Sequence, residues 1–202
     1  TDAAGCGTVV SNEVSIQVLP PFNPGMVTSS LDVLCHEESF TISGEAATGA
    51  DGDIEDVWMV SINGEPFEEA EYSSLEWTVN SSTSDYLVYL ESTSGFGCGT
   101  VASNTVEVQT LDPIVPPSVD FVDYDFTTLC FGDDAPELEV INLAEGADGN
   151  WEYTWESTSN GSVWLANQAS SENFSAGALA QSSSFRLRSE STFGCGTFYS
   201  NQ

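Results

Sequence analysis

The sequence predicts an all-β protein made of tandem Ig-like β-sandwich domains joined by Pro-rich linkers. One phrase, Gly-Cys-Gly-Thr followed by Ser-Asn, occurs at residues 5–12, 97–104 and 194–201. Its cysteines lie 92 and 97 residues apart, a spacing close to the length of one small β-domain. Short runs of alternating apolar and polar residues separate turn-rich stretches, and no run shows helical periodicity.

The repeated phrase also divides the chain. Its first two copies continue into an alternating strand, whereas the third copy reaches Gln202 before such a strand begins. We therefore expect a window on a longer array. The expected segments are the C-terminal hairpin of a preceding repeat (1–19), a linker (20–25), a complete Ig-like repeat that we call the second unit (26–111), another linker (112–117), and a third unit that lacks its last strand (118–202).

Strands of the second unit follow from period-two alternation. Phe40 and Ile42 mark an early strand, and residues 57–62 alternate on two faces. Asn63-Gly64 comes directly afterwards and predicts a hairpin with a type I′ turn, because both residues tolerate positive φ. Residues 86–90 are apolar on both faces, which is typical of a central strand.

The third unit repeats this plan at a spacing of 97 residues. The turn sequence Gly-Ala-Asp-Gly at 49–52 returns at 146–149, and Asn160-Gly161 matches the first Asn-Gly pair. Trp155 likewise matches Trp58, and we predict that each tryptophan lies in the core of its own sandwich.

The chain is strongly acidic, with 32 Asp and Glu against two basic residues, Arg186 and Arg188, and a formal net charge of −30. Nucleic acid is excluded as a partner, because binding to phosphates requires Lys and Arg. We interpret the charge as an adaptation to a saline or divalent-rich exterior. No apolar run approaches a membrane span, so we expect no membrane insertion in this segment.

The cysteine count is odd. Pairing Cys35 with Cys98 and Cys130 with Cys195 closes two loops of similar separation, 63 and 65 residues, and places the partner of Cys6 outside the window. Each bridge is expected to stabilise its unit by about 4 kcal/mol. This pairing predicts an oxidising compartment and secretion; buried free thiols are the alternative.

Few residues suggest chemistry. His36 is the only histidine, so a Ser-His-Asp or Cys-His arrangement would have to use it, and Phe131 takes its place in the third unit. We expect no catalytic residues and no enzyme activity. Asp51, Asp53 and Asp56 crowd one turn and are calcium candidates, although their spacing fails the EF-hand pattern. A diffuse cloud of cations is the alternative, and no other cofactor is expected.

Residues 151–164, 174–179, 185–188 and the phrase at 194–201 resemble the Ig-like repeats of very large surface adhesins of Bacteroidetes-type bacteria, including gliding-motility adhesins exported by type IX secretion. The resemblance covers most of the third unit and the Cys-Gly-Thr hairpin of all three copies; the second unit departs from it between residues 65 and 84. It implies an extracellular location at the bacterial cell surface.

These features favour a non-catalytic structural repeat segment of an adhesin or surface filament, acting as a disulfide-stapled acidic stalk. Its expected partners are neighbouring repeats of the same chain and other copies in a filament. Two alternatives stay open. One is a glycan- or protein-binding module that uses exposed Trp77, Trp151 or Trp164 to stack on sugars, although tryptophan in a small sandwich usually belongs to the core. The other is a polymer subunit that donates a strand to another copy.

Overall fold

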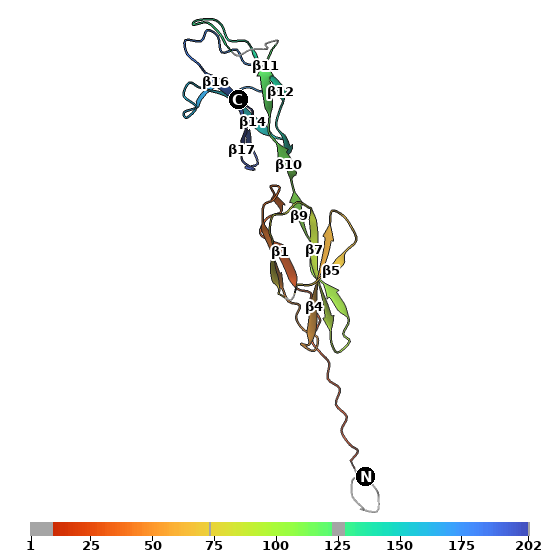
Figure 1. Ribbon diagram of the computed structural model, residues 1–202. Helices are drawn as coiled ribbons and strands as arrows, with labels where there is room; N and C mark the ends of the chain where they lie inside the picture. The colour runs from red at the N-terminus through yellow and green to blue at the C-terminus, as the bar shows by residue number, and fades with distance from the viewer. Residues whose placement is uncertain (1–9, 73, 123–127, 202) are drawn as a thin grey trace, which may run out of the picture.

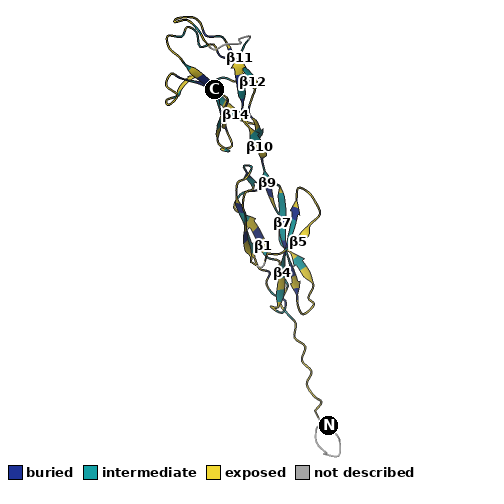
Figure 2. Cartoon of the chain, in the orientation of Figure 1, coloured by how far each residue is buried: buried dark blue, intermediate teal, exposed yellow. Residues whose placement is uncertain are grey.

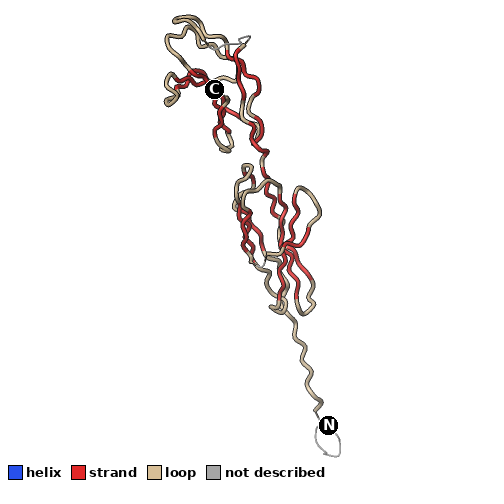
Figure 3. The backbone as a smooth tube through the Cα atoms, viewed as in Figure 1, coloured by secondary structure: helices blue, strands red, loops and turns tan. Residues whose placement is uncertain are grey.

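Two β-sandwiches lie end to end in the computed structural model, which describes residues 10–72, 74–122 and 128–201 (Figure 1). The segment before the first sandwich leads away at the end opposite to the second sandwich. All regular structure in these ranges is β-strand (Figure 3). The predicted all-β class and the Ig-like sandwich architecture are confirmed.

The second unit packs a sheet in the order β1-β3-β6 against a larger sheet in the order β2-β9-β7-β4-β5, with β8 also paired to β7. Its strands are β1 (Met26–Ser29), β2 (Val33–Leu34), β3 (Phe40–Glu45), β4 (Ile54–Ile62), β5 (Glu68–Ala70), β6 (Glu76–Val79), β7 (Tyr86–Ser94), β8 (Thr100–Ala102) and β9 (Val106–Thr110).

The core of the second unit lies between these sheets, and Trp58 on β4 is its largest fully buried side chain. The indole Nε1 donates to the carbonyl oxygen of Ser74 at 2.9 Å, so burial leaves no unpaired polar atom on this ring. Trp58 meets Trp77 edge to face, with ring centroids 6.0 Å apart. The interior positions alternate with exposed ones along the strands (Figure 2).

The Asn-Gly hairpin forms as predicted in the second unit only. Asn63 and Gly64 have φ values of 52° and 77°, and the Glu65 amide donates to the Ile62 carbonyl at 3.1 Å. In the third unit Gly161 alone of its pair has positive φ. There the side chain of Asn160 accepts hydrogen bonds from the backbone amides of Ser162 and Val163, which builds a different turn.

The third unit repeats the plan with fewer paired strands. It consists of a four-stranded sheet in the order β15-β14-β16-β17 and two strand pairs, β11-β12 and β10-β13. Its strands are β10 (Asp112–Val115), β11 (Ser118–Phe121), β12 (Leu138–Asn142), β13 (Glu145–Ala147), β14 (Trp151–Thr158), β15 (Leu165–Gln168), β16 (Ser184–Ser191) and β17 (Thr197–Tyr199).

Trp155 takes the place of Trp58 in the core of the third unit. It is fully buried, and its Nε1 donates to the carbonyl oxygen of Glu172 at 2.8 Å. Phe174 stacks on it with ring centroids 5.5 Å apart. This core is smaller, and Leu129 is only half-buried where its counterpart Leu34 in the second unit is fully buried.

The Ser-Asn ending of the repeated phrase closes each sandwich. The side chain of Asn104 accepts from the amide and donates to the carbonyl of Val27 on β1, both at 2.9 Å. Asn201 makes the same two bonds to Val119 on β11, at 2.9 and 2.8 Å. One asparagine in each unit therefore ties the first strand to the last hairpin across the two sheets.

Replacing this asparagine should weaken its own unit. We expect Asn104→Ala to lower the free energy of unfolding of the second unit by about 1–3 kcal/mol, because the buried amide and carbonyl of Val27 both lose their partner. Urea unfolding followed by tryptophan fluorescence measures the change. Asn80→Ala, at an exposed position of the same unit, is the matched control and should stay within about 0.5 kcal/mol of the parent. Equal effects of the two substitutions would contradict the role of Asn104.

Candidate functional site: the junction between the units

A disulfide joins the two units. Cys35 of the second unit is bonded to Cys195 of the third, with Cα atoms 5.5 Å apart and a sequence separation of 160 residues. The predicted pairs Cys35–Cys98 and Cys130–Cys195 are therefore wrong, and Cys98 and Cys130 are exposed free thiols. Cys6 lies outside the described residues.

Strand direction explains why Cys35 cannot reach Cys98. Strand β9 pairs with the first three residues of β7, at Tyr86 to Val88, and then leads on toward the third unit. The start of β7 therefore faces the third unit and its end faces away. Cys98 follows that far end. The nine residues of β7 separate its two ends by about 30 Å. Cys35 follows β2, whose partner is the C-terminal part of β9, at the end nearer the junction.

The third unit reaches the junction with its hairpin between β16 and β17 (Figure 1). Gly194 and Gly196 flank Cys195 with φ values of 99° and 118°, which presents the cysteine at the hairpin tip. A shallow cleft beside the bridge is lined by Leu31 and Val33 of the second unit and by Phe193 of the third. Apolar side chains from both units thus adjoin the covalent contact.

The Pro-rich linker forms a second connection at the junction. Leu111, directly after β9, donates its amide to the Leu34 carbonyl at 2.9 Å. The chain then continues as β10, which pairs with β13 and sets Asp112 opposite Ala147. Residues 112–115 of the predicted linker thus form a hydrogen-bonded strand of the third unit.

The Gly-Ala-Asp-Gly turns contact the Pro-rich linkers. A Cβ atom on Gly146 would lie 2.1 Å from the carbonyl oxygen of Pro113, and one on Gly49 would lie 1.8 Å from that of Pro21. Only glycine permits this approach, and both residues also have positive φ. The sequence identified these turns but carried no signal for their partners, because the contacting Pro and Gly residues are 28 residues apart in the second unit and 33 in the third.

His36 lies beside the bridge and lines the same cleft as Cys35 and Cys195. Both of these sulfurs are consumed by the disulfide, so neither can serve as a nucleophile for the imidazole. The arrangement offers His36 a packing position at the junction.

The calcium candidates make internal contacts. The carboxylates of Asp51 and Asp56 accept hydrogen bonds from the hydroxyls of Ser94 and Ser92 on β7. Within residues 10–72, 74–122 and 128–201 no three His, Cys, Asp or Glu residues come together as metal ligands would. Asp51 thus holds the turn against the end of β7, and Asp56 makes a cross-strand contact between β4 and β7. The structure does not gather Asp53 with them into a ligand set.

The three tryptophans considered for sugar stacking are engaged within the protein. Trp77 is buried and stacks on Tyr72 with ring centroids 4.4 Å apart. Trp151 is half-buried and meets Phe198 edge to face. The ring of Trp164 lies 4.0 Å below the guanidinium of Arg186. No flat, free aromatic platform is formed by these three.

Arg186 and Glu156 form a partly buried ion pair on the outer face of the third unit's larger sheet. The guanidinium donates to the Glu156 carboxylate at 2.7 Å, and it lies between the rings of Trp164 and Tyr199. Glu156 is only 7% exposed, so the contact with Arg186 offsets the cost of burying its carboxylate. The second unit has Met59 and Tyr89 at the corresponding positions of β4 and β7, without any charge.

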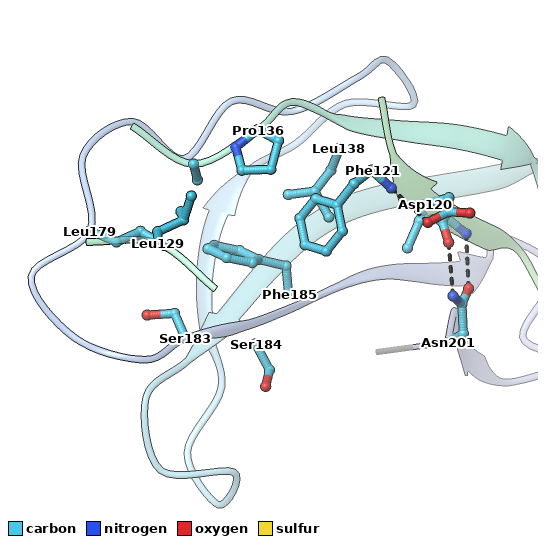
Figure 4. Close-up of a pocket in the computed structure, with 12 residues that line it drawn as sticks. Asp120, Phe121, Leu129, Pro136, Leu138, Leu179, Ser183, Ser184, Phe185 and Asn201 are labelled. Atoms are coloured by element: carbon cyan, nitrogen blue, oxygen red, sulfur yellow. Dashed lines mark hydrogen bonds between the residues drawn. The ribbon is translucent and has the colours of Figure 1, made fainter. Parts of the chain in front are cut away.

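The third unit also carries an open groove at one sheet edge (Figure 4). Its volume is about 440 Å³, and its lining includes Val119, Leu129, Leu138 and Phe185. In the second unit the matching place holds β9, whose Val108 is fully buried. The groove has an apolar floor and lies beside the start of β16.

Within the part of the chain that the structure describes, no helix is long and apolar enough to cross a membrane. A scan against protein-family models gives no match, and a search of curated proteins gives none either.

Two solved structures show a distant similarity. The three N-terminal domains of the highly immunogenic outer capsid protein (Hoc) of bacteriophage RB49 are 12% identical over 89% of this chain, with a TM-score of 0.37. The chain spans 58% of the length of that structure. The fibronectin(III)-like modules of Clostridium thermocellum CbhA are 12% identical over 87% of this chain and 93% of theirs, with a TM-score of 0.34. Similarity at this level carries no information about function.

The ion pair gives a stability prediction for the third unit. We expect Arg186→Met to lower its free energy of unfolding by about 2–3 kcal/mol, because it leaves the carboxylate of Glu156 buried beside only the more distant Arg188. The double variant Glu156→Met/Arg186→Tyr installs the second unit's residues and should recover most of that loss. Urea unfolding measures both. A double variant no more stable than the single one would show that the charge pair is not the cause.

Proposed function

We propose that this chain is a non-catalytic structural segment of a large extracellular adhesin or surface filament, an acidic stalk of Ig-like units that are bridged end to end. The observation that carries the proposal is the Cys35–Cys195 disulfide, which joins two units rather than closing one. A bridge between two units fixes their relative placement, and a stalk requires that its successive units stay fixed in this way.

The junction restrains bending because the units are connected twice. The backbone passes through β9 and β10, which are hydrogen-bonded to the second and third units respectively. The disulfide provides the second connection, from the turn after β2 to the hairpin tip after β16. Two separate tethers limit hinge motion far more than a single Pro-rich linker does, because bending about one tether would have to stretch the other.

The acidic composition makes such tethering useful. The chain carries a formal net charge of −30, so neighbouring units repel one another. Added salt screens exposed charges beyond about 10 Å at 0.1 M ionic strength, so this repulsion changes with the salt concentration. A covalent bridge keeps the units in contact whatever the salt concentration, which suits a stalk in a saline exterior.

The location follows the same chemistry. A disulfide between units is typical of proteins that work in an oxidising environment outside the cytoplasm. The repeated Gly-Cys-Gly-Thr phrase and the tryptophan-rich segment of the third unit support placement at a bacterial cell surface, in the class of adhesins that the sequence resembles. On this proposal the acidic, non-catalytic units extend the reach of an adhesive part.

Small-angle scattering tests the stalk geometry. We expect the oxidised chain to be elongated and to keep one maximum dimension from low salt to about 1 M NaCl, because the bridge fixes the junction. Cys35→Ser should broaden the distance distribution and make it depend on salt. Cys98→Ser is the matched control, since it removes a cysteine of the same unit without touching the junction. A compact particle, or a Cys35→Ser variant identical to the parent, would refute the proposed role.

Pulling on the two ends of a single molecule provides an independent measurement. In the oxidised chain the force passes through the sulfur atoms, so about 160 residues stay out of the force path, or about 550 Å of contour length. We expect reduction or Cys35→Ser to release this length, whereas Cys98→Ser should not. Equal extensions of oxidised and reduced chains would contradict the bridge as a mechanical connection.

A further inference from the structure

The second unit has an open cleft on the side of the sandwich where β5 and β6 are the edge strands of the two sheets. Each is the last strand of its sheet, so no further strand covers this side among the described residues. The volume of the cleft is about 770 Å³. All residues that line it lie between Val60 and Tyr86, well inside the chain.

Tyr72 presents an aromatic surface in this cleft. Its ring lies parallel to that of Trp77, with an angle of 7° between the planes and 4.4 Å between the centroids, so one face is covered. The residue is nevertheless 46% exposed, which leaves the opposite face of the ring open. Trp77 therefore supports an aromatic platform that Tyr72, and not a tryptophan, provides.

The backbone beside this platform is held in place. The amide of Tyr72 donates to the carbonyl oxygen of Ala70, the last residue of β5, at 2.8 Å. Three residues later the carbonyl of Leu75 accepts from the amide of Gly44 on β3 at 2.7 Å. These bonds attach the segment to both sheets, and a surface fixed in this way loses little conformational entropy when a ligand binds.

Trp77 also lines the cleft and carries an unpaired hydrogen-bond donor. The residue is 7% exposed, and its indole Nε1 has no hydrogen-bond partner among the described residues. Burying a donor without a partner costs about 1–3 kcal/mol. The third unit has Phe174 in this place, stacked on its core tryptophan and without a polar side-chain atom. The sandwich therefore does not require an indole N–H here, and the described chain supplies no acceptor for it.

An acidic side chain lies on the inner face of the wall formed by β4 and β5. Glu68 pairs with Val60, and residues directly opposite each other share one face of a sheet. Val60 packs against the core, so Glu68 is on the inner face, beside the cleft that it lines. Inward charges also protect sheet edges from strand addition. The third unit, however, has Leu165 at this register position, opposite Ser157, so the fold does not require a charge there.

These groups together match the chemistry of a sugar. A pyranose ring has an apolar face that stacks on an aromatic ring, hydroxyl hydrogens that a carboxylate accepts, and oxygens that accept from an N–H group. The charge then selects among sugars. Glu65, Glu68 and Glu69 all line the cleft of a chain with a formal net charge of −30, so uronic and sialic acids are repelled.

Other occupants use fewer of these features. A single cation would leave most of the cleft empty, because its volume falls within the range of about 300–1,000 Å³ that is typical of sites for larger ligands. A peptide added as a strand would pair with β5 or β6, which have only three and four residues. Such short edge strands offer few backbone groups for strand addition.

We propose that the cleft of the second unit is a binding site for a neutral oligosaccharide. One sugar ring stacks on the open face of Tyr72, its hydroxyls donate to the carboxylate of Glu68, and a sugar oxygen provides the acceptor for the indole N–H of Trp77. The third unit has Leu165 and Phe174 in place of two of these groups and lacks the site. The inference goes beyond the proposed stalk function, because it makes the second unit an adhesive element within the stalk.

The test uses the whole 202-residue chain with its disulfide formed. A glycan array that carries neutral and acidic oligosaccharides is probed with this chain at about 0.15 M NaCl, where nonspecific charge effects are screened. Isothermal titration calorimetry with the neutral glycan that gives the strongest signal then measures the Kd and the stoichiometry. We expect saturable binding of neutral glycans, with one site in each chain.

Matched variants locate the site. Tyr72→Leu should weaken binding about ten-fold because the stacking surface is lost, whereas Tyr72→Phe keeps the ring and should stay within about two-fold of the parent. Trp77→Phe installs the third unit's residue, keeps a ring behind Tyr72 and should weaken binding about ten-fold because the donor is removed. Glu68→Gln should weaken it about five-fold, since bonds to a charged acceptor are stronger. Glu107→Gln, at an exposed acid on β9 outside the cleft, is the charge-matched control.

Three results would overturn the inference: no neutral glycan on the array binds, acidic glycans bind in preference, or Tyr72→Leu binds as tightly as the parent. An octa-arginine peptide that binds the parent but not Tyr72→Leu would assign the cleft to a basic partner and would also overturn it. Each of these results leaves the stalk function standing, since that depends on the Cys35–Cys195 junction and is tested by scattering. Circular dichroism of each variant verifies that its units are folded.

Discussion

The bond between Cys35 and Cys195 is the constraint on which the arrangement of this molecule depends. Each sandwich has its own core around a tryptophan, so neither needs the other in order to bury apolar surface. What relates them is the bridge together with the strand that runs from β9 into β10. If the bridge acts by restricting the unfolded chain, a separation of 160 residues corresponds to roughly 5 kcal/mol. One bond therefore contributes both stability and orientation.

The repeated phrase combines three structural tasks within eight residues. In the copy at 194–201, the glycines allow the tight hairpin, Cys195 reaches the neighbouring unit, and Asn201 ties the first strand of its own unit. The inter-unit contact and the closure of the sandwich are thus adjacent in sequence and move together. A unit whose hairpin is misfolded would lose both at once, which couples the integrity of each unit to its attachment.

The outer faces of the two larger sheets differ between the units, whereas the phrase and the tryptophan core are shared. The third unit places Arg186 between two aromatic rings and against Glu156, whereas the second unit has Met59 and Tyr89 in the same places. The chain's only two basic residues are both committed to this cluster. The remaining surface is acidic, which keeps neighbouring units from associating except where a bridge and a paired strand hold them.

The local sequence pattern determined the all-β class, the alternation of β4 and β7, and the type I′ turn at Asn63-Gly64. It also determined the burial of Trp58 and Trp155. Each of these features depends on residues close in sequence or on period-two burial. The disulfide pairing depended on the tertiary structure. In a repeat, pairing within a unit and pairing with the next unit give equally regular spacings, so cysteine positions alone cannot distinguish them. The direction of β7 decides, because it carries Cys98 to the end of the second unit that faces away from the junction and leaves Cys35 beside the hairpin of the third.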